Sequence, residues 1–376
     1  METEYEKIIA KIETIDPIRY GKTRNFLWGN VSQLSPYVSR GVISTKQILE
    51  SLFKRGFKPH QLERLAQQLT WRDYFQRTAQ RFPELSVQNI KNDPVHFQNK
   101  RIPTAILNAN TQIDALDEGI DNLYNSGWIH NHMRMYLSML HTNVARSDWR
   151  SGARWMYYYL FDADMASNDL SWQWVCGANS HKLYVANQEN INKYTGSKQA
   201  QSYLDIEYEE FSQLPVPDAL KTTEELHLIS TESSINELKS IGFSIQTPNE
   251  LLTNEKENIA LYTWNNLDPN WHTDKNYRRL LLLDKDEFVK RPISQKTIEF
   301  VLELSQNIEN LEVVYGTFSD LKTQLSDATF YFKEHPSQIN WVGIEESRDW
   351  IFPEVAGYTS SFFGYWKKCE KYFKTY

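Results

Sequence analysis

Residues 162–174 read DADMASNDLSWQW and are the most informative stretch in the first half of the chain. The stretch combines two carboxylates, one asparagine and two tryptophans: Asp162, Asp164, Asn168, Trp172 and Trp174. Tryptophans beside a polar cluster suit a planar redox cofactor and a stacked aromatic substrate. A buried aromatic helix end is the simpler alternative for a tryptophan pair taken alone.

The composition indicates a globular chain rich in aromatic residues. A length of 376 residues suits two domains, and 12 Trp with 21 Tyr exceed ordinary usage. The net charge of -7 is unevenly divided, because residues 1–205 hold 24 Lys and Arg against 20 Asp and Glu. The first part can therefore present a basic face to phosphate, whereas the acidic remainder is less suited to do so.

Cysteine usage and hydropathy exclude several classes of protein. Two cysteines, Cys176 and Cys369, cannot build a disulfide framework or a four-cysteine iron–sulfur site. The charged helix predicted at residues 1–13 lacks the apolar run of a signal peptide, and no long apolar segment follows. We expect a cytoplasmic monomer without a metal and without contact to a membrane.

The chain divides into a helical part, residues 1–205, a proline-containing linker, residues 206–224, and an α/β part, residues 225–376. Apolar residues recur with helical spacing in the first part at residues 48–53, 62–75, 113–123, 133–144 and 154–160. Short apolar runs predict strands at residues 226–230, 259–264, 279–283, 311–315 and 328–332. A helix at residues 296–306 between such runs favours a mostly parallel sheet, and residues 352–372 are predicted to form a closing aromatic helix.

Four further motifs accompany the opening stretch: SQLSPYVSRG at 32–41, LTWRDY at 69–74, GWIHNHMRM at 127–135 and DWRSG at 148–152. Together and in this order they resemble the flavin-binding domain of the DNA photolyase and cryptochrome family, over roughly residues 18–199. The resemblance implies an all-α domain that holds FAD. The α/β part resembles the family's light-harvesting antenna domain, which would here follow the flavin domain in a permuted order. An unrelated α/β module is the alternative, and any antenna chromophore is unknown.

The resemblance assigns a set of residues to FAD. They are Tyr20, Ser32, Gln33, Leu34, Ser35, Arg72, Asn131, Arg134, Asp162, Asp164 and Asn168. Residues 32–35 correspond to the phosphate-binding segment, although Val31 replaces its first threonine. Arg134 and Asp162 correspond to an ion pair beside the flavin ring, and Asn168 to the residue that faces flavin N5. A neutral amide cannot supply a carboxyl proton there, which favours repair chemistry.

The resemblance also assigns residues to the DNA lesion. Trp71 and Trp174 correspond to two tryptophans that wedge around an extruded pyrimidine dimer. Asn131 and Met135 match enzymes for cyclobutane dimers, whereas enzymes for the (6-4) photoproduct carry histidine at both positions. Gln68 replaces the glutamate usual in cyclobutane-dimer enzymes and also occurs in the (6-4) branch.

Trp172 and Trp149 correspond to the first two members of the family's electron-transfer chain, but the third position falls near Ile90. The resemblance thus implies a light-driven, FAD-dependent enzyme that repairs cyclobutane pyrimidine dimers in damaged DNA. A cryptochrome-like photoreceptor, repair of (6-4) photoproducts, and a DNA-binding module without catalysis remain as alternatives.

Overall fold

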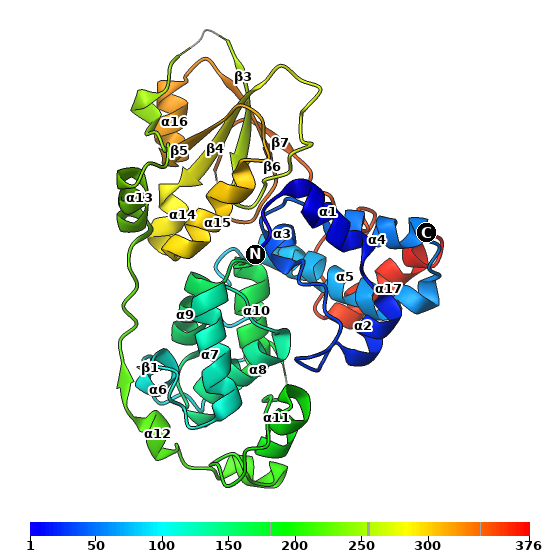
Figure 1. Ribbon diagram of the computed structural model, residues 1–376, viewed down its shortest axis with the longest axis vertical. Coiled ribbons are helices and arrows are strands. Elements are labelled where there is room, and N and C mark those ends of the chain that lie inside the picture. The colour runs from blue at the N-terminus through cyan, green and yellow to red at the C-terminus, as the bar shows by residue number, and fades with distance from the viewer. Residues whose placement is uncertain (181, 254–255, 339) are drawn as a thin grey trace. The chain divides into compact units, whose positions relative to one another are not determined.

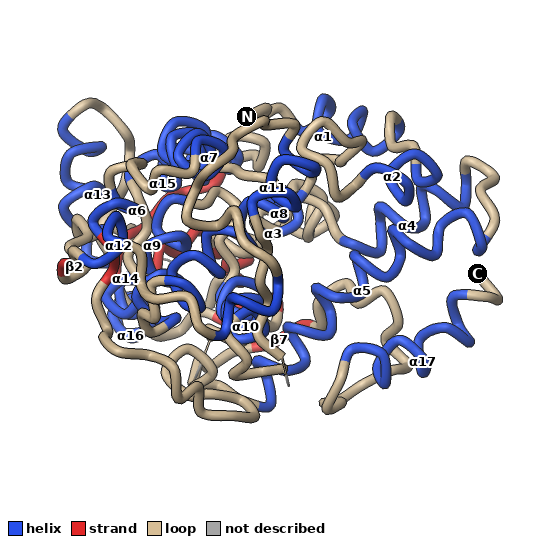
Figure 2. The backbone as a smooth tube through the Cα atoms, turned by 90° about the horizontal axis from the view of Figure 1, so that it is seen from below, coloured by secondary structure: helices blue, strands red, loops and turns tan. Residues whose placement is uncertain are grey.

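The computed structural model describes residues 1–180, 182–253, 256–338 and 340–376. The chain crosses between two units (Figures 1 and 2). Unit 1 consists of Met1–Ile15, Ser32–Tyr74 and Ile229–Tyr376, and unit 2 of Asp16–Val31 and Phe75–Leu228. The division expected from sequence, at residues 205 and 225, stays a prediction.

Unit 2 is mainly helical. Its helices are α2 (Pro17–Thr23), α6 (Thr104–Leu107), α7 (Asp114–Ser126), α8 (Asn131–Met139), α9 (Trp149–Tyr159), α10 (Met165–Val175), α11 (Gln188–Thr195) and α12 (Asp218–Lys221). Helices α9 and α10 each begin at a capping aspartate. Asp148 accepts a hydrogen bond from the Arg150 amide at the start of α9, and Asp164 accepts one from the Ser167 amide at the start of α10. Strands β1 (Ile102–Pro103) and β2 (Thr223–Glu224) pair antiparallel and form a small two-stranded sheet.

Unit 1 combines helices with a sheet. Its helices are α1 (Tyr5–Glu13), α3 (Ser35–Ser39), α4 (Thr45–Lys54), α13 (Thr231–Ser240), α14 (Lys285–Lys290), α15 (Gln295–Ser305), α16 (Phe318–Gln324) and α17 (Phe362–Phe373). Helix α5 (Pro59–Arg81) is long and contributes residues to both units. The five helical stretches predicted from apolar spacing fall on α4, α5, α7, α8 with the turn that follows it, and α9.

The sheet of unit 1 has five parallel strands in the order β5-β4-β3-β6-β7. They are β3 (Asn258–Thr263), β4 (Arg278–Asp284), β5 (Leu311–Gly316), β6 (Thr329–Lys333) and β7 (Ile344–Glu346). Leu261 lies opposite Leu280 in the central pair of strands. The predicted parallel sheet is confirmed, and four of the five predicted strands occur in it.

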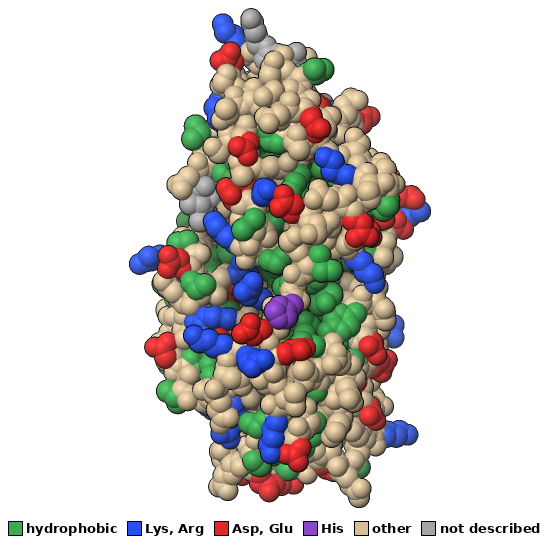
Figure 3. Space-filling model, turned by 90° about the vertical axis from the view of Figure 1, so that its left-hand side faces the viewer, with side chains coloured by type: hydrophobic (Ala, Val, Ile, Leu, Met, Phe, Trp, Pro, Cys, Tyr) green, Lys and Arg blue, Asp and Glu red, His purple; other side chains and the backbone are tan. Residues whose placement is uncertain are grey.

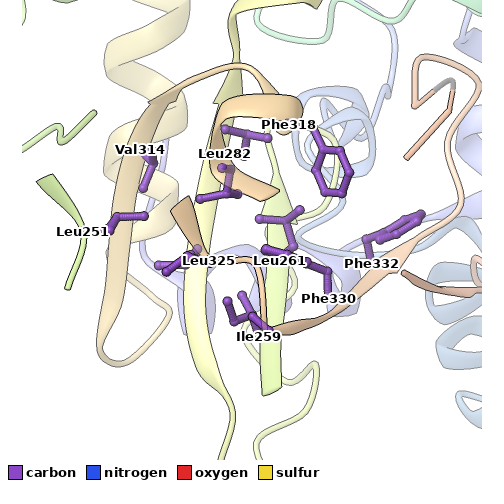
Figure 4. Packing of buried hydrophobic residues seen from close by; sticks show 12 residues of the cluster. Leu251, Ile259, Leu261, Leu282, Val314, Phe318, Leu325, Phe330 and Phe332 are labelled. Atoms are coloured by element: carbon purple, nitrogen blue, oxygen red, sulfur yellow. The ribbon is translucent and has the colours of Figure 1, made fainter. Parts of the chain in front are cut away.

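The core of unit 1 covers the sheet with apolar side chains from strands and from helix α16 (Figure 4). Leu261, Leu282 and Val314 are fully buried, and Phe318 and Phe330 stand edge-to-face at 5.5 Å between ring centroids. The central strands β3 and β4 are mostly buried, as is typical of strands in parallel sheets. This explains why they appear in the sequence as continuous apolar runs.

Three predictions of secondary structure need correction. Residues 226–230 form no strand; Ser230 instead caps helix α13 by accepting from the Ser233 amide. The closing aromatic helix begins at Phe362 rather than at residue 352, because Ser361 caps it there. The helix predicted at 133–144 changes to π-helical hydrogen bonding at Leu140.

Replacement of Leu282 by alanine should lower the free energy of unfolding by about 3 to 5 kcal/mol, because the side chain is fully buried and leaves a cavity. Leu252→Ala is the matched control, since Leu252 is 79% exposed and its loss should cost about 0.5 kcal/mol or less. Urea denaturation of both variants measures the difference. Equal destabilisation would contradict the packing described.

Candidate functional site

The carboxylate of Asp164 lies at the start of helix α10 and is buried, with two donors. Its Oδ1 accepts from the Ser167 amide at 2.8 Å, and its Oδ2 accepts from Gln76 Nε2 at 2.6 Å. These bonds fix both oxygens and offset the cost of burying the charge. The sequence did not single out Gln76, because its partner lies on a distant helix.

Asp162 and Arg134 form an ion pair, with Arg134 Nη2 and Asp162 Oδ2 2.8 Å apart. The carboxylate side chain is 3% exposed, while the guanidinium is 24% exposed and also donates from Nε to the Ile129 carbonyl at 3.1 Å. A buried pair is weak evidence for stability. It does hold a cationic group in a fixed orientation at the edge of helix α8, as the predicted flavin site requires.

The amide of Asn168 is held by two acceptors. Its Nδ2 donates to the Ala153 carbonyl at 3.0 Å and to Asp169 Oδ1 at 2.9 Å. Because both nitrogen hydrogens are engaged, the amide oxygen is the group that Asn168 can offer to a ligand. Asp169, buried next to Asn168, is a positioning residue that motif matching did not select.

Trp172 packs on a glycine of the neighbouring helix. A Cβ atom on Gly152 would come within 2.4 Å of the Trp172 ring, so the indole lies directly against the α9 backbone. His141 stands edge-on to it at 5.6 Å between ring centroids. Burial lowers the pKa of His141 to about 4, so a neutral imidazole faces the indole at pH 7.

Trp149 occupies the same helix as Gly152, one turn earlier. It is fully buried and donates from Nε1 to Asn89 Oδ1 at 2.9 Å, and the Arg150 guanidinium lies 4.8 Å from its ring. Ile90, which stands near the position of a third tryptophan in the family, packs into a hydrophobic cluster with Leu85 and Leu170.

Asn131 and Met135 lie one turn apart on helix α8 and touch, with Asn131 Nδ2 3.5 Å from Met135 Sδ. The flanking His130 caps the helix, since its Nδ1 accepts from the His132 amide at 3.1 Å. Burial, with the nearby charges of His130 and Arg24, lowers the pKa of His132 to about 4. His132 is therefore neutral at pH 7.

Two further predicted residues belong to unit 2. Trp174 is 42% exposed and its ring lies 5.8 Å from that of Tyr184, so a large part of the indole can meet a partner. Tyr20 lies on helix α2, where burial raises the pKa of its phenol and keeps it protonated.

The remaining predicted residues belong to unit 1. Ser32, Gln33, Leu34 and Ser35 lead into helix α3, with Gln33 in the left-handed region at φ 53°. Arg72 Nη1 donates to Ser39 Oγ at 3.0 Å, which links helix α5 to α3. Gln68 is half-buried on α5.

Trp71, which is half-buried, stacks on Phe362 of helix α17, with ring centroids 3.8 Å apart and planes 9° from parallel. Phe362 itself is 3% exposed. The stack joins two segments that lie far apart in the sequence, so the motifs could not reveal it. One face of the predicted base-stacking indole is thus covered by the chain itself.

A polar pocket of about 350 Å³ lies within unit 1 at the carboxyl ends of β3 and β6. Thr263, Lys333 and Asp73 line it, and Arg72 is the residue from the predicted cofactor set that reaches it. Ligands of parallel α/β sheets commonly bind at this edge. Asp284 and Gly316, which end the neighbouring strands β4 and β5, do not line the pocket.

The donors and acceptors of unit 2 fit a flavin. Such a ring system needs hydrogen-bond donors and acceptors along its polar edge and apolar surface at its faces. Arg134 supplies a fixed donor, and Asp164 and the oxygen of Asn168 supply acceptors; Trp172 is buried behind them against helix α9. In the described ranges no group of His, Cys, Asp or Glu is arranged to hold a metal ion. Among the helices of those ranges, none is long and apolar enough to cross a membrane.

Comparison with known proteins gives a match to the family model for the FAD binding domain of DNA photolyase over residues 65–207. A deoxyribodipyrimidine photo-lyase of Agrobacterium fabrum is 29% identical over 152 residues, which are 39% of this chain and 32% of that protein. One from Buchnera aphidicola subsp. Baizongia pistaciae is 30% identical over 169 residues, which are 42% of this chain and 34% of that protein. This chain thus spans about a third of the length of these relatives.

Among solved structures, a cryptochrome of Synechocystis sp. PCC6803 is similar, with a TM-score of 0.47 and 19% identity over 65% of this chain and 52% of that chain. The segment matched by the family model contains Gln68, Asn131, Asp162, Asn168 and Trp172. Residues 65–207 therefore match the helical FAD-binding domain of DNA photolyase, and the chain is similar to deoxyribodipyrimidine photo-lyases over about two fifths of its length.

Proposed function

We propose that this protein repairs cyclobutane pyrimidine dimers in DNA by light-driven electron transfer. When bound, reduced FAD would supply a photoexcited electron to the dimer and recover it after the ring has opened, with no net redox change. The proposal rests on helices α8 and α10, where the touching pair Asn131 and Met135 and the fixed amide of Asn168 lie inside the matched segment. No protein nucleophile is required.

The residues of the chain have separate roles in this proposal. Arg134, paired with Asp162, provides positive charge that favours a reduced, anionic flavin ring. Asn168 presents an amide oxygen and cannot deliver a carboxyl proton. Trp71 and Trp174 offer aromatic faces to extruded bases, for which stacking on indole is well suited. Tyr20, Ser32–Ser35 and Arg72 remain proposed contacts to the phosphates and edges of FAD.

A cryptochrome-like photoreceptor is the second candidate, and it stays open because Gln68 replaces the usual glutamate and Ile90 lies near the position of the third tryptophan. The same FAD chemistry would then drive a signal instead of repair. Gln68 leaves repair of the (6-4) photoproduct as a further outcome. The α/β part resembles the antenna domain, and its chromophore is unassigned.

The purified protein should contain about one FAD per chain and, once reduced, should remove cyclobutane dimers from a thymine-dimer oligonucleotide under blue light. Chromatography of the irradiated DNA measures the restored thymines, with a dark sample as control. A (6-4) lesion in the same sequence should persist. FAD-containing protein that leaves both lesions intact would support the photoreceptor, and repair of the (6-4) lesion alone would overturn the use of Asn131 and Met135.

Trp172→Phe should slow photoreduction of the flavin by about tenfold or more, because the indole next to Gly152 is the proposed first electron donor. Repair by chemically reduced protein, normalised to FAD content, separates electron supply from loss of the cofactor. Trp155→Phe is the matched control, since Trp155 is equally buried in unit 2 and instead donates to the Tyr124 hydroxyl at 2.9 Å. Photoreduction that is unchanged in Trp172→Phe would show that electrons enter elsewhere.

Gln68→Glu should keep or raise the rate of cyclobutane-dimer repair, since it restores the acceptor usual at this position. Gln67→Glu is the control, because it adds the same charge one residue away, rotated by about 100° on helix α5. Initial repair rates and the dissociation constant for dimer-containing DNA are measured together. Loss of repair in Gln68→Glu alone would show that the amide itself recognises the lesion.

A further inference from the structure

A ladder of aromatic rings reaches the surface of unit 2 at Trp28. The side chain is 67% exposed, and its ring stacks on Phe26 with centroids 4.6 Å apart and planes 30° from parallel. Phe26 contacts Tyr194 of helix α11 at 5.1 Å, and Tyr194 contacts His132 at 5.0 Å. An exposed tryptophan supported from beneath by further rings leaves its outer face available to a planar partner.

The loop that carries Trp28 is held in one shape by backbone contacts. The Leu27 amide donates to the Tyr194 carbonyl at 2.9 Å, and the Gly29 amide donates to the Phe26 carbonyl at 2.8 Å. A Cβ atom on Gly29 would lie 1.9 Å from the Thr23 carbonyl oxygen, so only glycine fits there. The indole is therefore displayed by a preorganised turn, which reduces the entropy lost on binding.

Basic side chains outnumber acidic ones around Trp28, where the neighbouring acid is Asp16, which caps helix α2. Acidic and basic side chains are interspersed on the face of the molecule shown in Figure 3. Residues 17–30, by contrast, contain three basic residues and no acidic residue. Lys193 adds a fourth cation, 5.4 Å from the Tyr194 ring. Within the part of the chain that the structure describes, these four side chains form no ion pair: Arg19, Lys22, Arg24 and Lys193.

We propose that these residues form a binding surface for single-stranded nucleic acid. The Trp28 surface, as we name it, consists of Arg19, Lys22, Arg24, Phe26, Trp28 and Lys193. A base would stack on the outer face of Trp28, and the cations would neutralise the phosphates on either side. Exposed indole with interleaved cations is the chemistry by which proteins hold unpaired strands. A duplex offers no such base face, and an acidic peptide offers charge without planar groups.

This surface goes beyond the proposed repair function, because its binding requires neither light nor a lesion. It would hold an undamaged strand. Its failure and the failure of the repair proposal are therefore observed in different experiments. Flavin content and dimer repair test the proposed repair function, whereas binding of undamaged DNA in the dark tests the Trp28 surface.

The test is fluorescence anisotropy of a labelled, undamaged oligothymidylate of about 16 nucleotides with the full-length protein in the dark. Trp28→Ala should weaken binding by about 5- to 150-fold, and Trp28→Phe, which keeps a ring, by less. Lys22→Gln should reduce the slope of log Kd against log salt by about 0.7, as expected for one lost phosphate contact. Each variant's FAD content is compared with that of the wild type, to show that unit 2 remains folded.

Two controls match these changes. Tyr208→Ala removes an aromatic side chain that is 44% exposed in an acidic stretch, and Lys239→Gln removes an exposed cation of helix α13; both should bind as the wild type does. Equal affinity of Trp28→Ala and Tyr208→Ala would overturn the proposal. So would no measurable affinity of the wild type for the oligonucleotide, or tighter binding of a duplex of the same length. Absence of measurable affinity would leave the exposed ring to a protein partner, whereas tighter duplex binding would make double-stranded DNA the partner.

Discussion

The close approach of helices α9 and α10 at Gly152 is the constraint on which the candidate site of unit 2 depends. Because residue 152 has no side chain, the indole of Trp172 rests on the α9 backbone. The same approach brings the Asn168 amide within reach of the Ala153 carbonyl. A single helix contact thus positions both the residue proposed to transfer electrons and the group proposed to face the flavin.

Buried carboxylates are the second feature of the site, and each has its own donor. Asp162 meets Arg134, Asp164 meets Gln76 and the Ser167 amide, and Asp169 accepts from Asn168. Three acids within eight residues of sequence would repel one another if they shared one polar space. Separate partners, two of them on helices α5 and α8, let the carboxylates remain close while each keeps a defined direction, so helix α10 can present fixed acceptors at its start.

Sequence reasoning could predict what depends on local pattern and motif order. The parallel sheet followed from apolar runs such as 259–264 and 279–283, whose alternation with helices is a local signal. The run at 226–230 was misassigned because apolar residues alone do not show whether a pairing strand exists, and Ser230 begins a helix instead. Gln76, Asp169 and Phe362 were missed because each acts through a contact that no spacing encodes. The resemblance proposed the residues of the candidate site, whereas their hydrogen-bond partners could be found only in the fold.

The stack of Trp71 on Phe362 bears on the entropy of ligand binding. An indole on a helix surface ordinarily samples several rotamers, and a ligand that orders it loses part of its binding free energy to that restriction. Here the parallel phenyl ring, itself buried at the start of helix α17, already restricts the rotation of Trp71. A planar ligand that reaches the opposite face of Trp71 therefore meets a side chain whose conformational freedom was already lost on folding. Helix α17, through Phe362, thus contributes to the rigidity of Trp71.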